Sequence, residues 1–291
     1  MKVSLLYNVS AGEGLSADAL CERLERSGHH VVHLVEKDAE LERVLDEETD
    51  LVVAAGGDGT VWRAVSALAG SDIPLAIFPL GTANNIARSL GIEGSIGQLI
   101  QGWKTARRRP LDIGMASGGW GESRFVEGVG AGLVSSGISE MDGKSSDDKE
   151  LDADSRLARA VRRYRDVLSQ LKPRPWKVTM DGHCFEGEFL LVEVLNIRSV
   201  GPNLVLAPEA NPSDGLFDVV AAGEEHRDEI DDYLRQRIKG REGRLSLPTR
   251  RARHVEVEGW QELHVDDTVC AGQSIATVTI EAEPQAVKFL A

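Results

Sequence analysis

The chain has 291 residues, of which 42% are hydrophobic, and a formal net charge of −14. This size and hydrophobic content are sufficient for the core of a soluble protein and suggest two domains. The negative charge argues against a nucleic-acid partner and against broad adhesion to anionic membranes. No run is long and apolar enough to cross a membrane, and Met1 to Ser4 has the pattern of a strand rather than of a signal peptide. Because the three cysteines lie far apart in the sequence, we expect free thiols and a cytoplasmic location.

The first third of the chain alternates predicted strands and helices. The expected elements are a strand over 2–7, a helix over 16–26 with Ser16 as its cap, a strand over 30–35, a helix over 39–45, a strand over 51–55 and a strand over 73–78. This alternation predicts a parallel sheet with helices on both faces. In such sheets ligands bind at the carboxyl ends of the strands.

The central strand, 51–55, runs into the glycine-rich turn Gly56-Gly57-Asp58-Gly59-Thr60, and a helical pattern follows at once. Glycines let the backbone approach a ligand closely, and a helix start capped by Thr60 favours an anion, so the turn suits a phosphate. Asp58 would repel a phosphate unless a cation lies between them, and Mg²⁺ fits that role. The simpler alternative is a tight turn with Asp58 facing solvent.

Two further polar turns follow predicted strands of the same sheet. One runs from Asn8 through Val9, Ser10 and Ala11 to Gly12, and the other is Pro79-Leu80-Gly81-Thr82-Ala83-Asn84-Asn85. Three such turns at one sheet edge would surround a nucleotide.

After about Leu111 the pattern changes to glycine-rich and alternating β segments. A helix is expected over 155–171, a hairpin over 176–188 with the turn Asp181-Gly182, a helix over 228–239, and strands over 189–196, 216–221, 254–257, 262–265, 276–280 and 286–290. The second half is therefore mainly antiparallel β. The basic run from Arg156 to Arg165 is either a solvated helix face or a face that meets lipid headgroups.

The ordered set of motifs resembles the diacylglycerol kinase catalytic-domain family, which includes lipid and sphingosine kinases and shares its glycine-aspartate signature with NAD kinases. The likeness rests on the three turns, on 125–133, and on 206–208 with 214–218, so it covers nearly the whole chain. It implies an α/β nucleotide-binding domain over 1–112 and a β-sandwich-like domain over 113–291, whose last strand returns to the first domain. The implied reaction transfers the ATP γ-phosphoryl group to a lipid hydroxyl with Mg²⁺.

The resemblance also implies roles for single residues. Asp58 would organise the catalytic metal, and a second metal would bind the Asp214 side chain and the carbonyls of Asn211 and Leu216. From the residues alone, such a loop is more often a turn with an aspartate cap. The implied nucleotide ligands are Asn8, Val9, Ser10, Ala11, Gly12, Gly56, Gly57, Asp58, Gly59, Thr60, Thr82, Asn84 and Asn85.

Three positions depart from the family pattern. Val9 replaces a proline, Asn85 replaces an acid, and Asp266-Asp267-Thr268 replaces Asp-Gly-Glu, whose glutamate is the expected general base. Threonine cannot accept a proton at neutral pH. Asp266 or Asp267 would then be the catalytic base, unless both aspartates only form a surface turn.

We therefore expect a lipid kinase that uses ATP and Mg²⁺ and contacts its substrate peripherally at a membrane surface. The alternatives are a catalytically weak nucleotide- or lipid-binding homologue, which Thr268 favours, and an NAD kinase. A homodimer is compatible with the sequence, which leaves the acceptor lipid and the oligomeric state open.

Overall fold

The computed structural model describes residues 1–8, 15–36, 45, 49–141, 151–271 and 277–291. It divides into two compact units: unit 1 comprises Met1–Asp112 with Pro284–Ala291, and unit 2 comprises Ile113–Glu283. The chain passes between the units twice, once within β5 (Arg108–Gly118) and once within β18 (Thr277–Leu290). The eight residues 284–291 therefore belong to the same unit as the start of the chain.

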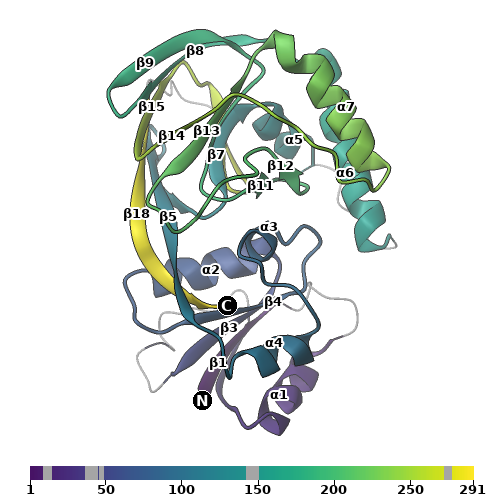
Figure 1. Cartoon of the computed structure of the whole chain (residues 1–291), viewed down its shortest axis with the longest axis vertical. Helices are drawn as coiled ribbons and strands as arrows, with labels where there is room; N and C mark the ends of the chain where they lie inside the picture. Colours follow the sequence, from purple (N-terminus) through teal and green to yellow (C-terminus); the bar gives the residue numbers. More distant parts are fainter. Residues whose placement is uncertain (9–14, 37–44, 46–48, 142–150, 272–276) are drawn as a thin grey trace. The chain divides into compact units, whose positions relative to one another are not determined.

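Unit 1 is a parallel sheet covered by helices on both faces (Figure 1). Its strand order is β2-β1-β3-β4, and β18 joins β4 in parallel where Phe289 pairs with Leu75. The remaining elements of unit 1 are β1 (Lys2–Tyr7), α1 (Ala17–Arg26), β2 (His30–Glu36), β3 (Leu51–Gly56), α2 (Asp58–Leu68), β4 (Leu75–Pro79), α3 (Asn85–Ser89) and α4 (Ile96–Gly102).

Every residue of β3 is buried, as expected of a central parallel strand. Leu20 and Leu24 of α1 and Ile96 and Ile100 of α4 pack into one cluster with alternate residues of β1 and β3, while α2 covers the opposite face. The predicted Ser16 cap of α1 is confirmed, because its side chain accepts a hydrogen bond from the Ala19 amide. Helix α4 is not among the elements predicted from the sequence, although Ser95 and Gln98 form a capping box at its start.

Unit 2 is built from antiparallel strands with three longer helices. One sheet has the order β14-β13-β10-β7-β16-β17; the other pairs β18 with β15, β15 with β8 and β8 with β9, and a β5–β6 hairpin joins β18. The elements are β6 (Gly121–Phe125), β7 (Gly128–Gly132), α5 (Leu133–Met141), α6 (Ala153–Gln170), β8 (Arg174–Met180), β9 (His183–Phe189), β10 (Leu191–Leu195), β11 (Ser199–Val200), β12 (Leu204–Val205), β13 (Phe217–Ala222), a short 3₁₀ turn (Glu224–His226), α7 (Arg227–Ile238), β14 (Thr249–Ala252), β15 (His254–Glu258), β16 (Glu262–Val265) and β17 (Thr268–Ala271).

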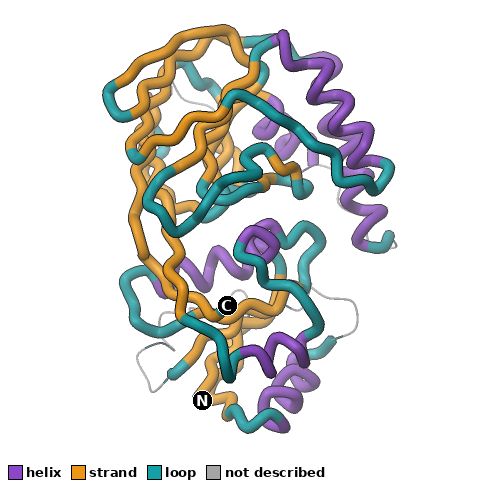
Figure 2. Tube along the Cα trace, in the orientation of Figure 1, coloured by secondary structure: helices purple, strands orange, loops and turns teal. Residues whose placement is uncertain are grey.

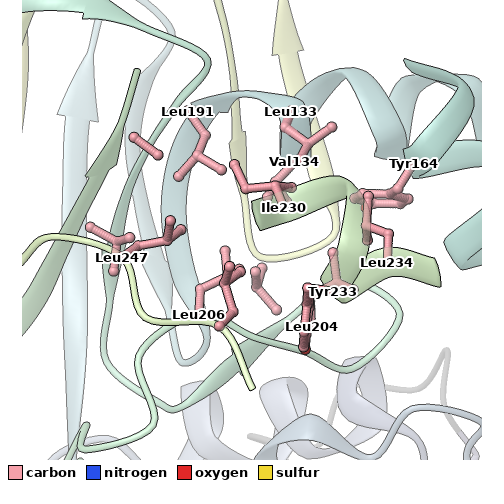
Figure 3. Close-up of a cluster of buried hydrophobic side chains, with 14 of the residues drawn as sticks. Leu133, Val134, Tyr164, Leu191, Leu204, Leu206, Ile230, Tyr233, Leu234 and Leu247 are labelled. Carbon is pink, nitrogen blue, oxygen red and sulfur yellow. The ribbon is translucent and has the colours of Figure 1, made fainter. Parts of the chain in front are cut away.

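Two hydrophobic clusters lie on the two faces of the β7-containing sheet. Val192 and Val194 of β10 join Val178, Val255 and other residues of the second sheet, which makes the inner layer of a sandwich. On the other face, Leu191 of β10 packs with residues of α5, α6 and α7, as Figure 3 shows for Leu133, Tyr164 and Ile230. The tube in Figure 2 shows how strands and helices separate within this unit.

The predicted class, an α/β domain followed by a mainly antiparallel β-sandwich-like domain, is confirmed. The hairpin turn is also confirmed, since Asp181 and Gly182 both have positive φ. Two local predictions are wrong. Gly57, not Thr60, is the N-cap of α2, and the two strands expected over 276–280 and 286–290 are one strand, β18, with Gln285 at φ 54°. The helix expected over 39–45 falls almost wholly outside the described residues.

Candidate functional site

The turn after β3 and the turn after β4 touch through their glycines. A Cβ atom added to Gly81 would lie 2.4 Å from the Gly57 Cα, and one added to Gly57 would lie 3.2 Å from the Gly81 Cα. Only glycine allows two backbones to come this close at the end of neighbouring parallel strands. The result is a surface of backbone groups at the carboxyl edge of the sheet, next to the start of α2, which favours an anion such as a phosphate.

Asp58 lies at the first position of α2 and is held by the second turn. Its Oδ1 accepts a hydrogen bond of 2.9 Å from the Ile86 amide at the start of α3. Burial raises the pKa of Asp58, and the amides of Ile86, Asn85 and Asn84 partly oppose that shift. The Asp58 carboxylate is thus held by the second turn, and the residue is only partly buried.

Asn84 shapes the turn that carries Thr82. It has φ 51°, its Oδ1 accepts a hydrogen bond from the Gly81 amide, and its Nδ2 donates to the Gly81 carbonyl. Asn85 is buried, and Thr82 is half-buried. The three residues therefore lie on one ordered turn. Asn84 mainly stabilises this turn, and the side chain of Thr82 remains partly accessible.

Thr60 follows Asp58 by two residues and is almost completely buried. Its Oγ1 has no hydrogen-bond partner among the described residues and lies close to Gly56, where an added Cβ would be 2.3 Å away. Asn8, at the end of β1, donates its amide to the Ala55 carbonyl at 3.2 Å, which brings it beside the β3 turn. Val9, Ser10, Ala11 and Gly12 lie outside the described residues.

The chemistry of this edge fits a Mg²⁺–nucleotide. Among the described residues no three His, Cys, Asp or Glu side chains gather into a metal site. A single carboxylate such as Asp58, completed by phosphate oxygens and waters, is a common way for proteins to bind Mg²⁺. The fixed carboxylate and the glycine surface therefore fit a metal that arrives with its nucleotide.

In unit 2 the polar groups of the loop before β13 already have hydrogen-bond and ion-pair partners within the protein. Asp214 accepts a hydrogen bond from the Leu216 amide on Oδ1 and an ion pair from Arg251 on Oδ2. The Asn211 carbonyl accepts from the Ser213 amide at 2.8 Å. Arg251 already supplies a positive charge to Asp214. The oxygen atoms expected to bind a second metal therefore do not fit a metal ion while the Arg251 side chain stays in this position.

Asp266 and Asp267 form the two-residue connection between β16 and β17. The Asp266 carboxylate accepts hydrogen bonds from the amides of Val126, Glu127 and Gly128, at 3.0, 2.8 and 3.1 Å. Burial raises the pKa of Asp266 to about 6, although these three amides lower it. Asp266 is thus an anchor between β16 and the start of β7.

Asp267 and Thr268, the next two residues, are both exposed. Their side chains contact each other, with 3.4 Å between Thr268 Oγ1 and Asp267 Oδ1. Of the two aspartates in this turn, Asp267 has the accessible carboxylate.

One pair of polar residues in this sheet, Glu193 of β10 and His264 of β16, is not among the candidate residues predicted from the sequence. Both are fully buried, and 2.9 Å separates His264 Nε2 from Glu193 Oε2. A polar residue in the middle of an apolar strand, as in Leu191-Val192-Glu193-Val194-Leu195, was the available signal, but its partner is 71 residues away.

The basic run of α6 is partly neutralised within unit 2. Arg165 pairs with Asp231 of α7 at 2.6 Å, whereas Arg162 is exposed. No described helix is both long enough and apolar enough to span a bilayer.

Comparisons with known proteins cover nearly the whole chain. Residues 2–116 match the diacylglycerol kinase catalytic domain, and residues 132–291 match the YegS C-terminal NAD kinase beta sandwich-like domain. A diacylglycerol kinase of Mycobacterium tuberculosis is 30% identical over 276 residues, which are 88% of this chain and 85% of the relative. A diacylglycerol kinase of Bacillus subtilis is 28% identical over 238 residues, 75% of this chain and 73% of the relative.

Two solved structures share the fold. The crystal structure of a diacylglycerol kinase from Bacillus anthracis has a TM-score of 0.69 at 21% identity, covering 99% of this chain and 96% of that one. An NAD kinase from Archaeoglobus fulgidus in complex with ATP has a TM-score of 0.53 at 13% identity, covering 100% and 94%.

Proposed function

The chain belongs to the diacylglycerol kinase catalytic-domain family of lipid kinases, and from this premise we propose that it transfers the γ-phosphoryl group of ATP to a lipid hydroxyl with the help of Mg²⁺. The observation that carries the proposal is Asp58, which is fixed by the Ile86 amide between two glycine turns at the carboxyl edge of a parallel sheet. This arrangement presents many backbone groups to an anion and one carboxylate to the cation that accompanies it.

Phosphoryl transfer depends mostly on positioning and charge neutralisation, which are the functions that these turns can supply. The Gly56–Thr60 turn and the start of α2 would bind phosphate oxygens, Thr82 and Asn8 would contact the nucleotide, and Asp58 would hold the metal directly or through water. When bound, Mg²⁺ neutralises phosphate charge. In unit 2 Asp267 is our candidate for the base that accepts the proton of the lipid hydroxyl.

The acceptor we propose is a lipid at a membrane surface, reached by peripheral contact. The names of the relatives support a diacylglycerol-like acceptor, and a sphingoid base has the same primary hydroxyl chemistry. The exposed part of the basic α6 face, including Arg162, supports contact with anionic headgroups, because each basic residue near such a surface contributes about 1 kcal/mol.

The deciding experiment incubates purified protein with Mg²⁺ and γ-labelled ATP against separate vesicles of diacylglycerol, monoacylglycerol, ceramide, sphingosine and phosphatidylglycerol, and against NAD. We expect label in one lipid and none in that lipid with Asp58→Asn. Label in NAD alone would replace the proposal by an NAD kinase, which the ATP-bound structural relative favours only at the level of fold.

A second candidate is a catalytically weak binding protein, and the observations at the β16–β17 turn favour it. Asp266 is engaged by three amides, and Thr268 stands where the family has a glutamate. If this turn limits the rate, Thr268→Glu should raise kcat by about 10²–10⁴, the usual contribution of a general base. Thr268→Gln is the matched control, since it adds the same length without a base; an equal gain in both variants would contradict the explanation.

A further inference from the structure

The fully buried pair Glu193 and His264 spans three strands of the unit 2 sheet. In the pairing register, Glu193 of β10 and His264 of β16 both lie opposite Gly130 of β7, the strand between them. Their side chains meet over this glycine, with 2.9 Å between His264 Nε2 and Glu193 Oε2. Two strands that do not pair with each other are therefore joined by one hydrogen bond.

Gly130 is required for this contact. A Cβ atom at position 130 would lie 2.0 Å from Glu193 Oε2, so any side chain there would displace the carboxylate. On the same face, a Cβ at Gly128 would lie 2.6 Å from Leu195 Cδ2. The glycines of the 128–132 segment thus leave space that neighbouring strands fill, and at position 130 the space is filled by an acid and a histidine.

The hydrogen-bond chemistry of His264 fixes its orientation. Its Nδ1 is 2.8 Å from the Asp266 backbone carbonyl, which can only accept, so Nδ1 carries a hydrogen. The Nε2 atom then shares a proton with Glu193, as an imidazolium beside a carboxylate or as a neutral imidazole beside a carboxyl group. The link from Glu193 through the ring to Asp266 exists in both forms.

The surroundings keep this proton in place. Burial raises the pKa of Glu193 despite the nearby imidazole, and the pKa of His264 is raised because Glu193 outweighs the effect of burial. Tyr164 lies on the same face, in the cluster drawn in Figure 3, and its hydroxyl has no hydrogen-bond partner among the described residues.

A buried acid–base pair of this kind contributes little net stability compared with apolar residues of similar volume. Stability alone therefore does not explain why the sheet contains it.

Hydrogen bonds connect this pair to the turn that carries the candidate base. His264 Nδ1 donates to the Asp266 carbonyl, the Asp266 amide donates to the Gly128 carbonyl at 2.9 Å, and the Asp266 carboxylate takes the three amides of 126–128. Every backbone polar group of Asp266 and both of its carboxylate oxygens are thus bound. The next two residues, Asp267 and Thr268, are exposed.

We propose that Glu193 and His264 are positioning residues, which fix the Asp266–Thr268 turn so that Asp267 is presented in one orientation to the acceptor hydroxyl. This inference rests on the proposed function. The ring holds the first residue of the turn, Glu193 holds the ring, and Gly130 provides the space for both. Misplacing a reacting group by about 1 Å can lower a rate by about 10²-fold, so loss of this anchor should lower kcat.

The test replaces the pair in two ways. Glu193→Gln keeps the shape and can donate to His264 Nε2, so the ring stays in place; we expect kcat within about threefold of wild type. The paired replacement Glu193→Leu with His264→Leu fills the site with apolar volume and removes the bond to Asp266. Such replacements usually preserve folding, so we expect an unchanged Tm, an unchanged KM for ATP and a kcat lowered by about 10- to 100-fold.

A paired variant that keeps kcat within threefold of wild type would overturn the proposal. Hydrogen exchange of the amides of 126–128 supplies a readout that needs no turnover. We expect faster exchange there in the paired variant and unchanged exchange in Glu193→Gln. If the wild-type protein phosphorylates no lipid, the proposed function fails separately, and unchanged exchange in the paired variant would then overturn the anchor itself.

Discussion

Asp58 in unit 1 and Asp266 in unit 2 are held by the same kind of contact. Each follows a strand, and each carboxylate accepts backbone amide hydrogen bonds from a distant segment, 28 residues away for Asp58 and 138–140 residues away for Asp266. They differ in how their turns are built. The Asp58 turn depends on glycine backbones in contact, whereas the Asp266 turn depends on two buried side chains, Glu193 and His264, on the strands that flank β7.

A short motif in the sequence is informative for only one of these two turns. Each glycine of the contact lies in a short motif of consecutive residues, so Gly56 to Thr60 is visible in the sequence as a unit. A turn fixed by a buried pair requires residues far apart, and its own residues, Asp266 and Asp267, look like any surface turn. The same physical anchor is therefore conspicuous in one unit and hidden in the other.

The largest expected effect comes from Asp58. Asp58→Asn keeps an oxygen for the Ile86 amide but removes the charge that we assign to the metal, so we expect kinase activity to fall by at least about 10²-fold. Because burial raises the pKa of Asp58, the neutral amide should not lower Tm. Activity with each lipid and thermal unfolding check this, and a variant that loses stability and activity together would mean that Asp58 is mainly structural.

A methyl group at the glycine contact should come next. Gly81→Ala places a Cβ 2.4 Å from the Gly57 Cα, and overpacking of this kind costs about 1–3 kcal/mol. We expect lower Tm and weaker ATP binding by calorimetry. Gly97→Ala in α4 is the matched control, because nothing lies within 4 Å of its added Cβ and a helical alanine stabilises by about 0.5–1 kcal/mol. Equal Tm changes in the two variants would contradict the close contact.

The Asp266 anchor should respond to pH. The pKa of Asp266 is raised from 3.8 to about 6, so its contribution to folding is complete below about pH 4 and is lost as pH rises through 6. Asp266→Asn cannot ionise and should lack this loss. We therefore expect the Tm of wild type, measured against that of the variant, to fall between pH 4 and pH 7. A relative Tm that rises over this range would show that the three amides outweigh burial.

The smallest effect concerns the loop before β13. The pair of Arg251 and Asp214 is partly exposed and is expected to contribute about 0.5–1 kcal/mol, or about 1–4 °C in Tm. Without nucleotide, the Tm of the wild-type protein should not change when a chelator is added. The Arg251→Leu variant should have a lower Tm, and the Tm of this variant should rise when Mg²⁺ is added. The exposed Arg253→Leu is the control. A wild-type Tm that falls with chelator would show that a metal, not Arg251, closes this loop.

The fold class and most element positions were predictable because they depend on local periodicity and capping. Lys2 to Tyr7 matches β1, and the Asp181-Gly182 turn supplies the positive φ that a tight hairpin requires. Thr60 was assigned as a cap because threonine often is one, but Gly57 occupies the N-cap position and Thr60 is buried in the first turn.

The hidden part of the candidate site arises from strand order. Glu193, His264 and Gly130 come together only because β10, β7 and β16 are neighbours in that order, and no local pattern specifies it. The Arg251 contact has the same origin, since β13 and β14 place Arg251 opposite Asp218, close to Asp214. Long-range pairing decided both contacts.

The return of the chain to unit 1 constrains how the protein can be made. Gly70 donates its amide to Ala286, Asp112 accepts from the Gln285 amide, and Arg107 exchanges two backbone hydrogen bonds with Ala291. During translation these partners emerge only after all of unit 2 has left the ribosome. Unit 1 is thus begun first but completed last, so a chain that stops before Pro284 carries an unfinished sheet edge in unit 1.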